Sequence, residues 1–340
     1  MTSASSKPLQ ASFRDDGMAG TGIAIIVPCY RERSHILDVL AEIGPETQHI
    51  YVIDDACPDK TGEFVRENCT DERVHVVTNE RNLGVGGATM AGYRKALEAG
   101  ARYIVKLDGD GQMAPSFIPV LVAPLIKGEA DYVKGNRFHA LGSLAGMPKS
   151  RLFGNFVLSF ASKLSSGYWN IFDPTNGFTA IHADSARALS FSEISKGYFF
   201  ESDMLFHLGL LRAVVRDIPM QAHYGNETSG IRIPTIVPEF MLKHYVNTYR
   251  RIFITYFLRE TNVATLQLIL GKLLLLFGIV FGLINWIESE TTGVNSSAGT
   301  VVLAALPIIV GSQLMIAFLS YDTRNVPTKP IQAPSAGSTT

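Results

Sequence analysis

The sequence predicts an α/β domain, built on a mostly parallel sheet with helices on both faces, followed by two membrane-spanning helices. Three observations support this fold class. Short apolar runs rich in β-branched residues alternate with helical patterns between residues 23 and 110. Acidic motifs follow the ends of two of these runs. Two long apolar stretches lie near the C-terminus, and each reaches the roughly 20 residues that a membrane span needs.

Four of the apolar runs are predicted as buried strands, at residues 23–27, 50–53, 74–78 and 103–107. Helical patterns follow the first three, at residues 36–43, 61–68 and 88–99. Because ligands bind at the carboxyl ends of the strands in such sheets, the residues just after each strand are candidate site residues. The segment from Gly135 to Gly230 is less regular and rich in aromatic residues, glycine and arginine, which suits a substrate-binding half.

Composition divides the chain into successive segments. Residues 1–22 are rich in serine, alanine and glycine, and we expect a disordered tail there. The α/β domain is expected over residues 23–235. Residues 236–262 carry aromatic side chains at i, i+4 spacing among basic residues, which predicts amphipathic helices in a membrane interface; helices packed on the domain are the alternative. The spans are predicted at residues 263–287 and 299–320, and a cytosolic tail at residues 321–340.

The distribution of charge predicts the topology. The connection between the spans, residues 288–298, contains no lysine or arginine, whereas Arg250, Arg251 and Arg259 precede the first span and Arg324 follows the second. By the positive-inside rule, the α/β domain and both termini face the cytosol of a bacterial-type inner membrane, which the chain crosses twice. The net charge of −1 indicates no nucleic-acid partner. The three cysteines lack metal-ligand spacing and imply no disulfide framework.

The strongest chemical signal follows the fourth predicted strand, where Asp108 and Asp110 stand one residue apart and Gln112 follows. Carboxylate and amide oxygens at this spacing can hold one hard cation, and Mg²⁺ or Mn²⁺ keeps coordination sites open for substrate phosphates. Such a cation would neutralise the charge on a departing diphosphate. A lone pair of acids at this spacing is also common as a solvated turn, so the interpretation depends on the motifs around it.

Three further motifs occupy the neighbouring strand ends and a helix start: Pro28-Cys29-Tyr30-Arg31-Glu32, Asp54-Asp55-Ala56-Cys57-Pro58-Asp59-Lys60-Thr61 and Asn82-Leu83-Gly84-Val85-Gly86-Gly87-Ala88. Together with the two acids and the glutamine, they resemble the family-two inverting glycosyltransferases of the GT-A fold. Within that family the resemblance is to the dolichyl- and polyprenyl-phosphate sugar synthases, and it runs from about residue 23 to residue 231. Two departures, Arg31 for the usual asparagine and Ala56-Cys57 for the usual glycine-serine, lie beside the implied base pocket.

The resemblance implies roles for the residues of these motifs. The implied nucleotide-binding residues are Pro28, Tyr30, Glu32, Asp54, Asp55 and Asp108, with Asp55 on the base. The implied metal ligands are Asp108, Asp110 and Gln112. Capping a turn is the alternative for Asp54 and Asp55. The glycines between Gly84 and Gly87 match neither a dinucleotide fingerprint nor a P-loop, so we interpret them as close packing of a helix against a strand.

The resemblance also implies a catalytic set further along the chain. Arg137 lies in a segment that resembles the family's G-S-R, and Arg151 follows about one helix later; both are candidates for binding the diphosphate and the acceptor phosphate. Salt bridges at the surface are the alternative for both. Asp173 begins a segment that resembles D-x-x-S-G-F and would orient the acceptor or complete the metal site. Asp203 occupies the place of the acid that deprotonates a hydroxyl acceptor in relatives with sugar acceptors.

These features predict a hexosyltransferase of the membrane. It would move a sugar with inversion from a nucleotide-sugar, UDP-hexose being expected, to polyprenyl phosphate at the cytosolic face, for the synthesis or modification of cell-surface glycans. A lipid monophosphate needs no general base, because it is already largely dianionic at neutral pH. Two alternatives stay open: extension of a lipid-linked glycan with Asp203 as base, and a membrane-tethered nucleotide-binding protein without catalysis. The lipid bilayer is a partner in each case, and a homo-oligomer stays open.

Overall fold

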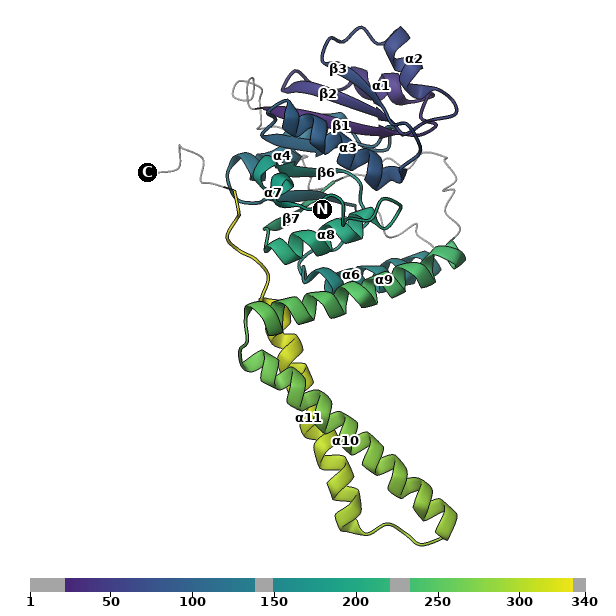
Figure 1. Ribbon diagram of the computed structural model, residues 1–340, viewed down its shortest axis with the longest axis vertical. Coiled ribbons are helices and arrows are strands. Elements are labelled where there is room, and N and C mark those ends of the chain that lie inside the picture. The colour runs from purple at the N-terminus through teal and green to yellow at the C-terminus, as the bar shows by residue number, and fades with distance from the viewer. Residues whose placement is uncertain (1–21, 138–148, 221–232, 333–340) are drawn as a thin grey trace, which may run out of the picture. The chain divides into compact units, whose positions relative to one another are not determined.

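The computed structural model describes residues 22–137, 149–220 and 233–332 (Figure 1). The predicted tail at residues 1–22 therefore lies almost wholly outside the described residues. The chain divides into two compact units. The first, called unit 1, comprises the chain up to Tyr245 together with the C-terminal segment from Pro327 onwards; the second, called unit 2, comprises Val246–Val326.

Unit 1 is built on a seven-stranded mixed sheet of the order β3-β2-β1-β4-β6-β5-β7. The strands are β1 (Ile23–Cys29), β2 (Thr47–Asp54), β3 (Val74–Thr78), β4 (Tyr103–Lys106), β5 (Tyr132–Asn136), β6 (Thr179–His182) and β7 (Val215–Pro219). Only β6 runs antiparallel to its neighbours, so the sheet is mostly parallel, as predicted. The four predicted N-terminal strands are confirmed within a few residues at their ends.

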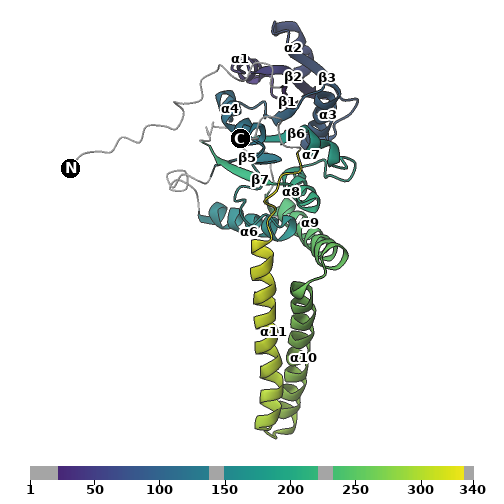
Figure 2. The same cartoon turned by 90° about the vertical axis from the view of Figure 1, so that its left-hand side faces the viewer.

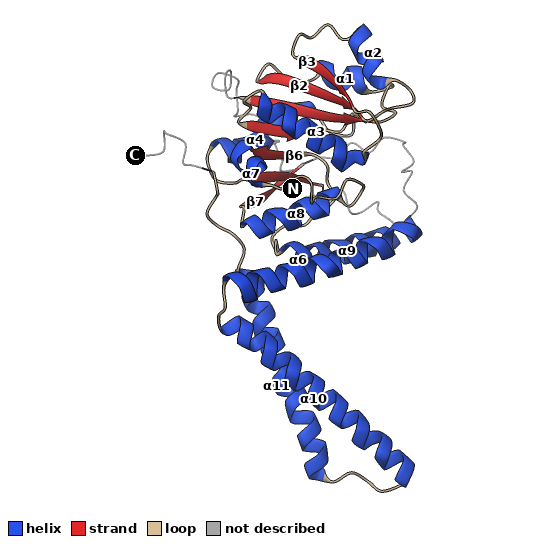
Figure 3. Cartoon of the chain, in the orientation of Figure 1, coloured by secondary structure: helices blue, strands red, loops and turns tan. Residues whose placement is uncertain are grey.

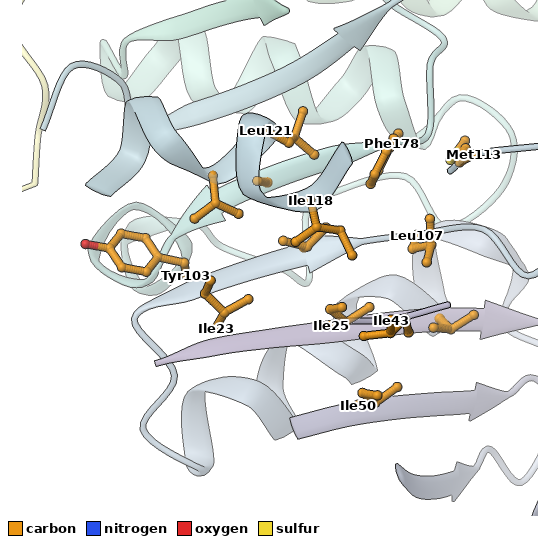
Figure 4. Packing of buried hydrophobic residues seen from close by; sticks show 14 of the residues in the cluster. Ile23, Ile25, Ile43, Ile50, Tyr103, Leu107, Met113, Ile118, Leu121 and Phe178 are labelled. Carbon is orange, nitrogen blue, oxygen red and sulfur yellow. The ribbon is translucent and has the colours of Figure 1, made fainter. Parts of the chain in front are cut away.

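Helices cover both faces of this sheet (Figure 3). They are α1 (Ile36–Ala41), α2 (Thr61–Asn68), α3 (Gly84–Glu98), α4 (Ile118–Ile126), α6 (Lys149–Ser166), α7 (Ala183–Ala188) and α8 (Phe200–Leu211). Alternate residues of a strand point to opposite faces. Ile23 and Ile25 join one core with Ile118 and Leu121 of α4 (Figure 4). The neighbouring Ile26 faces α3, where Gly92 leaves no room for a Cβ.

The second half of unit 1 is more regular than the sequence predicted. β6 and β7 with α6, α7 and α8 lie in the segment expected to be less regular, and the last two residues of β5 reach into it. Their patterns are hard to recognise because β5 and β6 are short and fully buried, and carry Lys134, Asn136 and Thr179 among apolar residues. Short buried strands lack the alternation that identifies a half-exposed strand. This region extends the sheet of unit 1.

Unit 2 contains a helical hairpin (Figure 2). Helix α9 (Ile233–Phe253) carries the chain into it, a π-helical turn over Ile254–Arg259 follows, and α10 (Val263–Thr292) and α11 (Ala298–Arg324) pack against each other. Gly271, Gly278 and Gly311 allow this close approach of the two helices. Both helices are long and apolar enough to cross a membrane, and each is longer than its predicted span.

In unit 2, a buried network of polar side chains connects the segment before α10 to the end of α11. The guanidinium of Arg251 donates to both carboxylate oxygens of Asp322, at 2.7 and 3.0 Å, and the hydroxyl of Tyr256 donates to the same carboxylate at 2.6 Å. All three side chains are buried. A buried carboxylate needs such partners, because losing one of them leaves an unbalanced charge. The network therefore joins the start of unit 2 to the last turn of α11.

Candidate active site

A cavity of about 730 Å³ opens at the carboxyl ends of the parallel strands of unit 1. Its wall includes Tyr30 beyond β1, Asp55 beyond β2 and Asp108 beyond β4. These three strand ends are neighbours because β2, β1 and β4 are adjacent in the sheet. The cavity thus lies where α/β sheets bind their ligands.

Three residues predicted to contact a nucleoside, Pro28, Tyr30 and Glu32, line this cavity. The ring of Tyr30 is exposed, and the guanidinium carbon of Arg31 lies 5.6 Å from its centroid. Arg31 has a φ of 68°, in the left-handed region that asparagine adopts at less cost than arginine. This wall presents an aromatic ring and a carboxylate, groups that suit a nucleoside.

The two acids after β2 hold backbone N–H groups. Asp54 accepts hydrogen bonds from the N–H of Cys57 at 2.7 Å and of Gly62, in the first turn of α2, at 2.6 Å. Asp55 accepts from the side chain of Asn79 and from the N–H groups of Leu83 and Gly84. This is the capping role that the sequence left as the alternative. Both side chains are buried, but Asp55 contributes to the cavity wall and Asp54 does not.

The glycine-rich first turn of α3 has a packing role, as interpreted. A Cβ on Gly86 would lie 2.5 Å from the carbonyl oxygen of Ser195 and 2.7 Å from the side chain of Phe200. The partner is therefore the segment that leads into α8, and not a strand as the sequence suggested. The close approach lets the N–H of Gly86 donate to the carbonyl of Lys196 at 2.8 Å.

Two of the three predicted metal ligands belong to the cavity wall, whereas the third, Gln112, does not line the cavity. Asp108 and Asp110 both line it, and the turn between them and α4 is closed by a 3.0 Å hydrogen bond from the N–H of Gln112 to Asp110. Among the described residues, no group of three or more histidine, cysteine or acidic side chains is arranged to hold a metal ion. Two hard carboxylates facing an open cavity still fit Mg²⁺ or Mn²⁺, because these ions take their remaining ligands from water and substrate phosphates.

Lys106, which the sequence motifs did not indicate, is the last residue of β4 and is buried. Its ammonium donates to Asp108 at 2.6 Å and lies 3.5 Å from Glu201. Burial lowers the pKa of Lys106, but the negative charges of Asp108 and Glu201 outweigh burial and raise the pKa above its ordinary value. The only signal in the sequence is a lysine that interrupts an apolar strand.

Asp173 and Arg137 form a bidentate salt bridge with each other. The carboxylate of Asp173 is fully buried and accepts from the backbone N–H, Nε and Nη2 of Arg137, at 3.2, 2.8 and 2.9 Å. A bidentate pair of this kind has strong geometric specificity. The cavity wall includes Thr175 from the same segment, but neither Asp173 nor Arg137. The structure brings these two predicted residues together as partners of each other.

Of the two acids at the start of α8, it is Glu201 that lines the cavity. Asp203 is buried and accepts the N–H of Ser195 at 2.7 Å. The two residues are separated by about 200° around the helix, because each residue turns it by about 100°. Glu201 and Asp203 therefore cannot face the same cavity. The sequence motif predicted a site role for Asp203, which does not line the cavity.

One part of the cavity wall is largely apolar. Leu158 of α6, the exposed Tyr198, and Val237 and Phe240 of α9 form it. Ser165 and His244, which are hydrogen bonded at 2.8 Å, hold α6 and α9 together within unit 1. Arg151 belongs to α6, but its side chain lies outside the described residues. The cavity thus joins an acidic end at the strand termini to an apolar end between helices.

Comparison with known protein families is consistent with this geometry. Residues 24–190 match the model of glycosyl transferase family 2. The chain is 34% identical to the undecaprenyl-phosphate mannosyltransferase of Micrococcus luteus over 58% of this chain and 82% of that protein. It is 30% identical to the UDP-N-acetylglucosamine–dolichyl-phosphate N-acetylglucosaminyltransferase of Methanococcus voltae, over 61% and 88%. Polyprenol monophosphomannose synthase of Mycolicibacterium smegmatis is 31% identical over 53% and 69%.

Solved structures support the fold. Glucosyl-3-phosphoglycerate synthase from Mycobacterium tuberculosis, in complex with Mn²⁺, UDP-glucose and phosphoglyceric acid, superposes with a TM-score of 0.50 and 19% identity over 68% of this chain and 80% of that one. Its complex with phosphoglyceric acid gives the same TM-score and 20% identity over the same shares. At this identity the likeness concerns the GT-A fold alone. The sheet, the acids at its strand ends and the matched sequence together establish that this chain is a glycosyltransferase and belongs to glycosyl transferase family 2.

Proposed function

We propose that the protein transfers a hexose, with inversion, from a nucleotide-sugar to polyprenyl phosphate, giving a lipid-phosphate sugar for cell-surface glycans. UDP-hexose is the expected donor. One observation carries this proposal: a single cavity has an acidic end at Asp55, Asp108 and Asp110 and an apolar end at Leu158 and Phe240. A diphosphate with its metal suits the first end. A phosphate attached to a hydrocarbon chain suits the second.

The relatives support this class of acceptor. Two are named as transferases for undecaprenyl or dolichyl phosphate and the third as a polyprenol monophosphomannose synthase, and two of the three names specify mannose. The mycobacterial structure with Mn²⁺ and UDP-glucose supports a divalent cation beside the nucleotide. In this chain Asp108 and Asp110, with Gln112 adjacent, would hold Mg²⁺ or Mn²⁺, which stabilises the negative charge that develops on the leaving diphosphate.

In this reaction, different residues of the chain have different roles. Tyr30 and Glu32 bind the nucleoside, while Asp55 orders the loop that begins α3. The acceptor phosphate is already ionised, so no side chain has to remove a proton from it. Catalysis then consists of holding a phosphate oxygen in line with the anomeric carbon and stabilising the departing charge. Arg137 is kept in place by Asp173, and Arg151 stays a candidate for the acceptor phosphate.

An alternative acceptor is a hydroxyl of a lipid-linked glycan. The sequence named Asp203 as the base for that reaction, but the cavity wall contains Glu201 instead. The two acceptors differ in whether a general base is needed, so a direct assay of acceptors separates them.

The assay incubates the purified full chain with Mn²⁺ and radiolabelled UDP-glucose, UDP-N-acetylglucosamine or GDP-mannose. Polyprenyl phosphate, unphosphorylated polyprenol and a polyprenyl-diphosphate-linked sugar are offered separately. We expect label in the lipid phase with polyprenyl phosphate and one donor. Label only with the lipid-linked sugar would replace the proposal with the hydroxyl acceptor. Nucleotide binding without transfer to any acceptor would favour a non-catalytic role.

We also propose that unit 1 and both termini lie in the cytosol of a bacterial-type inner membrane. Both ends of the hairpin return to unit 1, because α9 leaves it and the C-terminal segment rejoins it. The N–H groups of Ile331 and Gln332 donate to the buried carboxylate of Asp131, at distances from 2.9 to 3.0 Å. The predicted cytosolic tail is thus bound to unit 1 at these residues.

Cysteine labelling tests this topology. A cysteine introduced at Ser296, between α10 and α11, is expected to react with a membrane-impermeant maleimide in intact cells, because no basic residue retains that loop in the cytosol. A cysteine at Thr328 is expected to react only after the membrane is opened. The opposite pattern would place unit 1 outside the cytosol and contradict the proposal.

A further inference from the structure

Two buried lysines lie at the same level of the sheet, on the two strands that flank β6. Lys106 of β4 and Lys134 of β5 both pair in register with Thr179 of β6, the strand between them. Both are at most 1% exposed. Lysine is rarely buried this fully unless its ammonium has partners, so each has to be accounted for by the groups around it.

The partners of the two lysines differ in one respect. Lys134 donates to the carbonyl oxygen of Asn176 at 2.5 Å, and Lys106 donates to that of the next residue, Gly177, at 3.3 Å. Both lysines therefore hold the same loop. Lys106 also contacts two carboxylates, Asp108 at 2.6 Å and Glu201 at 3.5 Å. An ammonium has three N–H groups, and these three acceptors account for them.

Lys106 contacts two residues of the cavity wall but does not itself line the cavity. Asp108 lies at the end of β4 and Glu201 in the first turn of α8; both line the cavity, with side chains 28% and 12% exposed. The cavity wall does not include Lys106. Without the ammonium, the two carboxylates would repel each other across the space it fills. Any effect of Lys106 on ligands must therefore pass through Asp108 and Glu201.

We propose that Lys106 is a positioning residue that orients Asp108 and ties it to Glu201, so that a divalent cation and the nucleotide diphosphate bind as one unit. This inference rests on the proposed function. With Oδ1 of Asp108 held by Lys106, the carboxylate keeps one orientation toward the cavity. When the ammonium is removed, Asp108 can turn, and the uncompensated acids attract a cation whether or not nucleotide is present. The coupling between cation and nucleotide is then lost.

Titration calorimetry on the full chain in detergent tests this coupling. The dissociation constants of UDP and of GDP are measured in EDTA and in Mn²⁺, and their ratio is the coupling factor. Lys106→Met is expected to reduce the coupling factor of the preferred nucleotide at least tenfold. Lys134→Met is the matched control, because it removes a buried ammonium from the same loop but touches neither carboxylate. It is expected to keep the coupling factor within threefold of the wild type.

Each possible result of the titrations either supports or contradicts the inference. An equal loss of the coupling factor in Lys106→Met and Lys134→Met would mean that Lys106 only holds the loop, and it would overturn the inference. A wild-type coupling factor in Lys106→Met would overturn the inference as well. If Lys106→Met does not fold, Lys106→Gln, which keeps polar contacts but not the charge, must show the same loss. A wild type without coupling would overturn the inference together with the metal assignment. The acceptor class would still stand, because the lipid assay decides it separately.

Discussion

Asp110→Ala is expected to abolish sugar transfer while leaving the protein folded. Asp110 lines the cavity, is partly exposed and belongs to the turn after Asp108 rather than to the core. Loss of one of two protein carboxylates should release the cation that stabilises the leaving diphosphate. That stabilisation is worth several kcal/mol, so the rate should fall by at least about a thousandfold.

The measurement is initial-rate transfer to polyprenyl phosphate at saturating Mn²⁺, with the thermal unfolding midpoint recorded for each variant. Asp184→Ala is the control, because this exposed acid of α7 pairs with Arg187 and is absent from the cavity wall. The wild type should lose activity in EDTA and regain it with Mn²⁺ or Mg²⁺. Full activity in EDTA, or in Asp110→Ala, would contradict the metal assignment.

Gly177→Ala is expected to reduce transfer by about a hundredfold with a much smaller effect on folding. A Cβ at this position would overlap Oδ2 of Asp108 and lie 2.6 Å from Nζ of Lys106. The carboxylate at the cavity floor would have to move. A displacement of about 1 Å in a catalytic site can lower the rate about a hundredfold.

Gly154→Ala provides the matched control for the same substitution. Gly154 lies in α6, and a Cβ there meets nothing within 4 Å. Alanine in a helix is favoured over glycine by about 1 kcal/mol, so this variant should be active and no less stable. Equal rates for Gly177→Ala and the wild type would show that the position of Asp108 does not limit transfer. Equal losses in both variants would point to a general effect of added methyl groups.

The sequence by itself determined the features that depend on local pattern. Apolar β-branched runs followed by helical periodicity predicted the first four strands and their helices, because alternation and propensity act over a few residues. The acids after β2 and β4 were found for the same reason: the end of a parallel strand places the next residues at the binding edge. The two helices that are long and apolar enough to cross a membrane were visible from composition alone, since about 20 apolar residues suffice.

Only the tertiary structure decided which side chains meet. Asp173 and Arg137 both carry the right chemistry, but their 36-residue separation conceals that they pair with each other. Glu201 and Asp203 differ by two residues, and the orientation of α8 sends only Glu201 to the cavity. Lys106 gains its role from Gly177 and Glu201, which lie 71 and 95 residues further along the chain. Local sequence sets each element, whereas long-range packing selects the face that each element presents to the site.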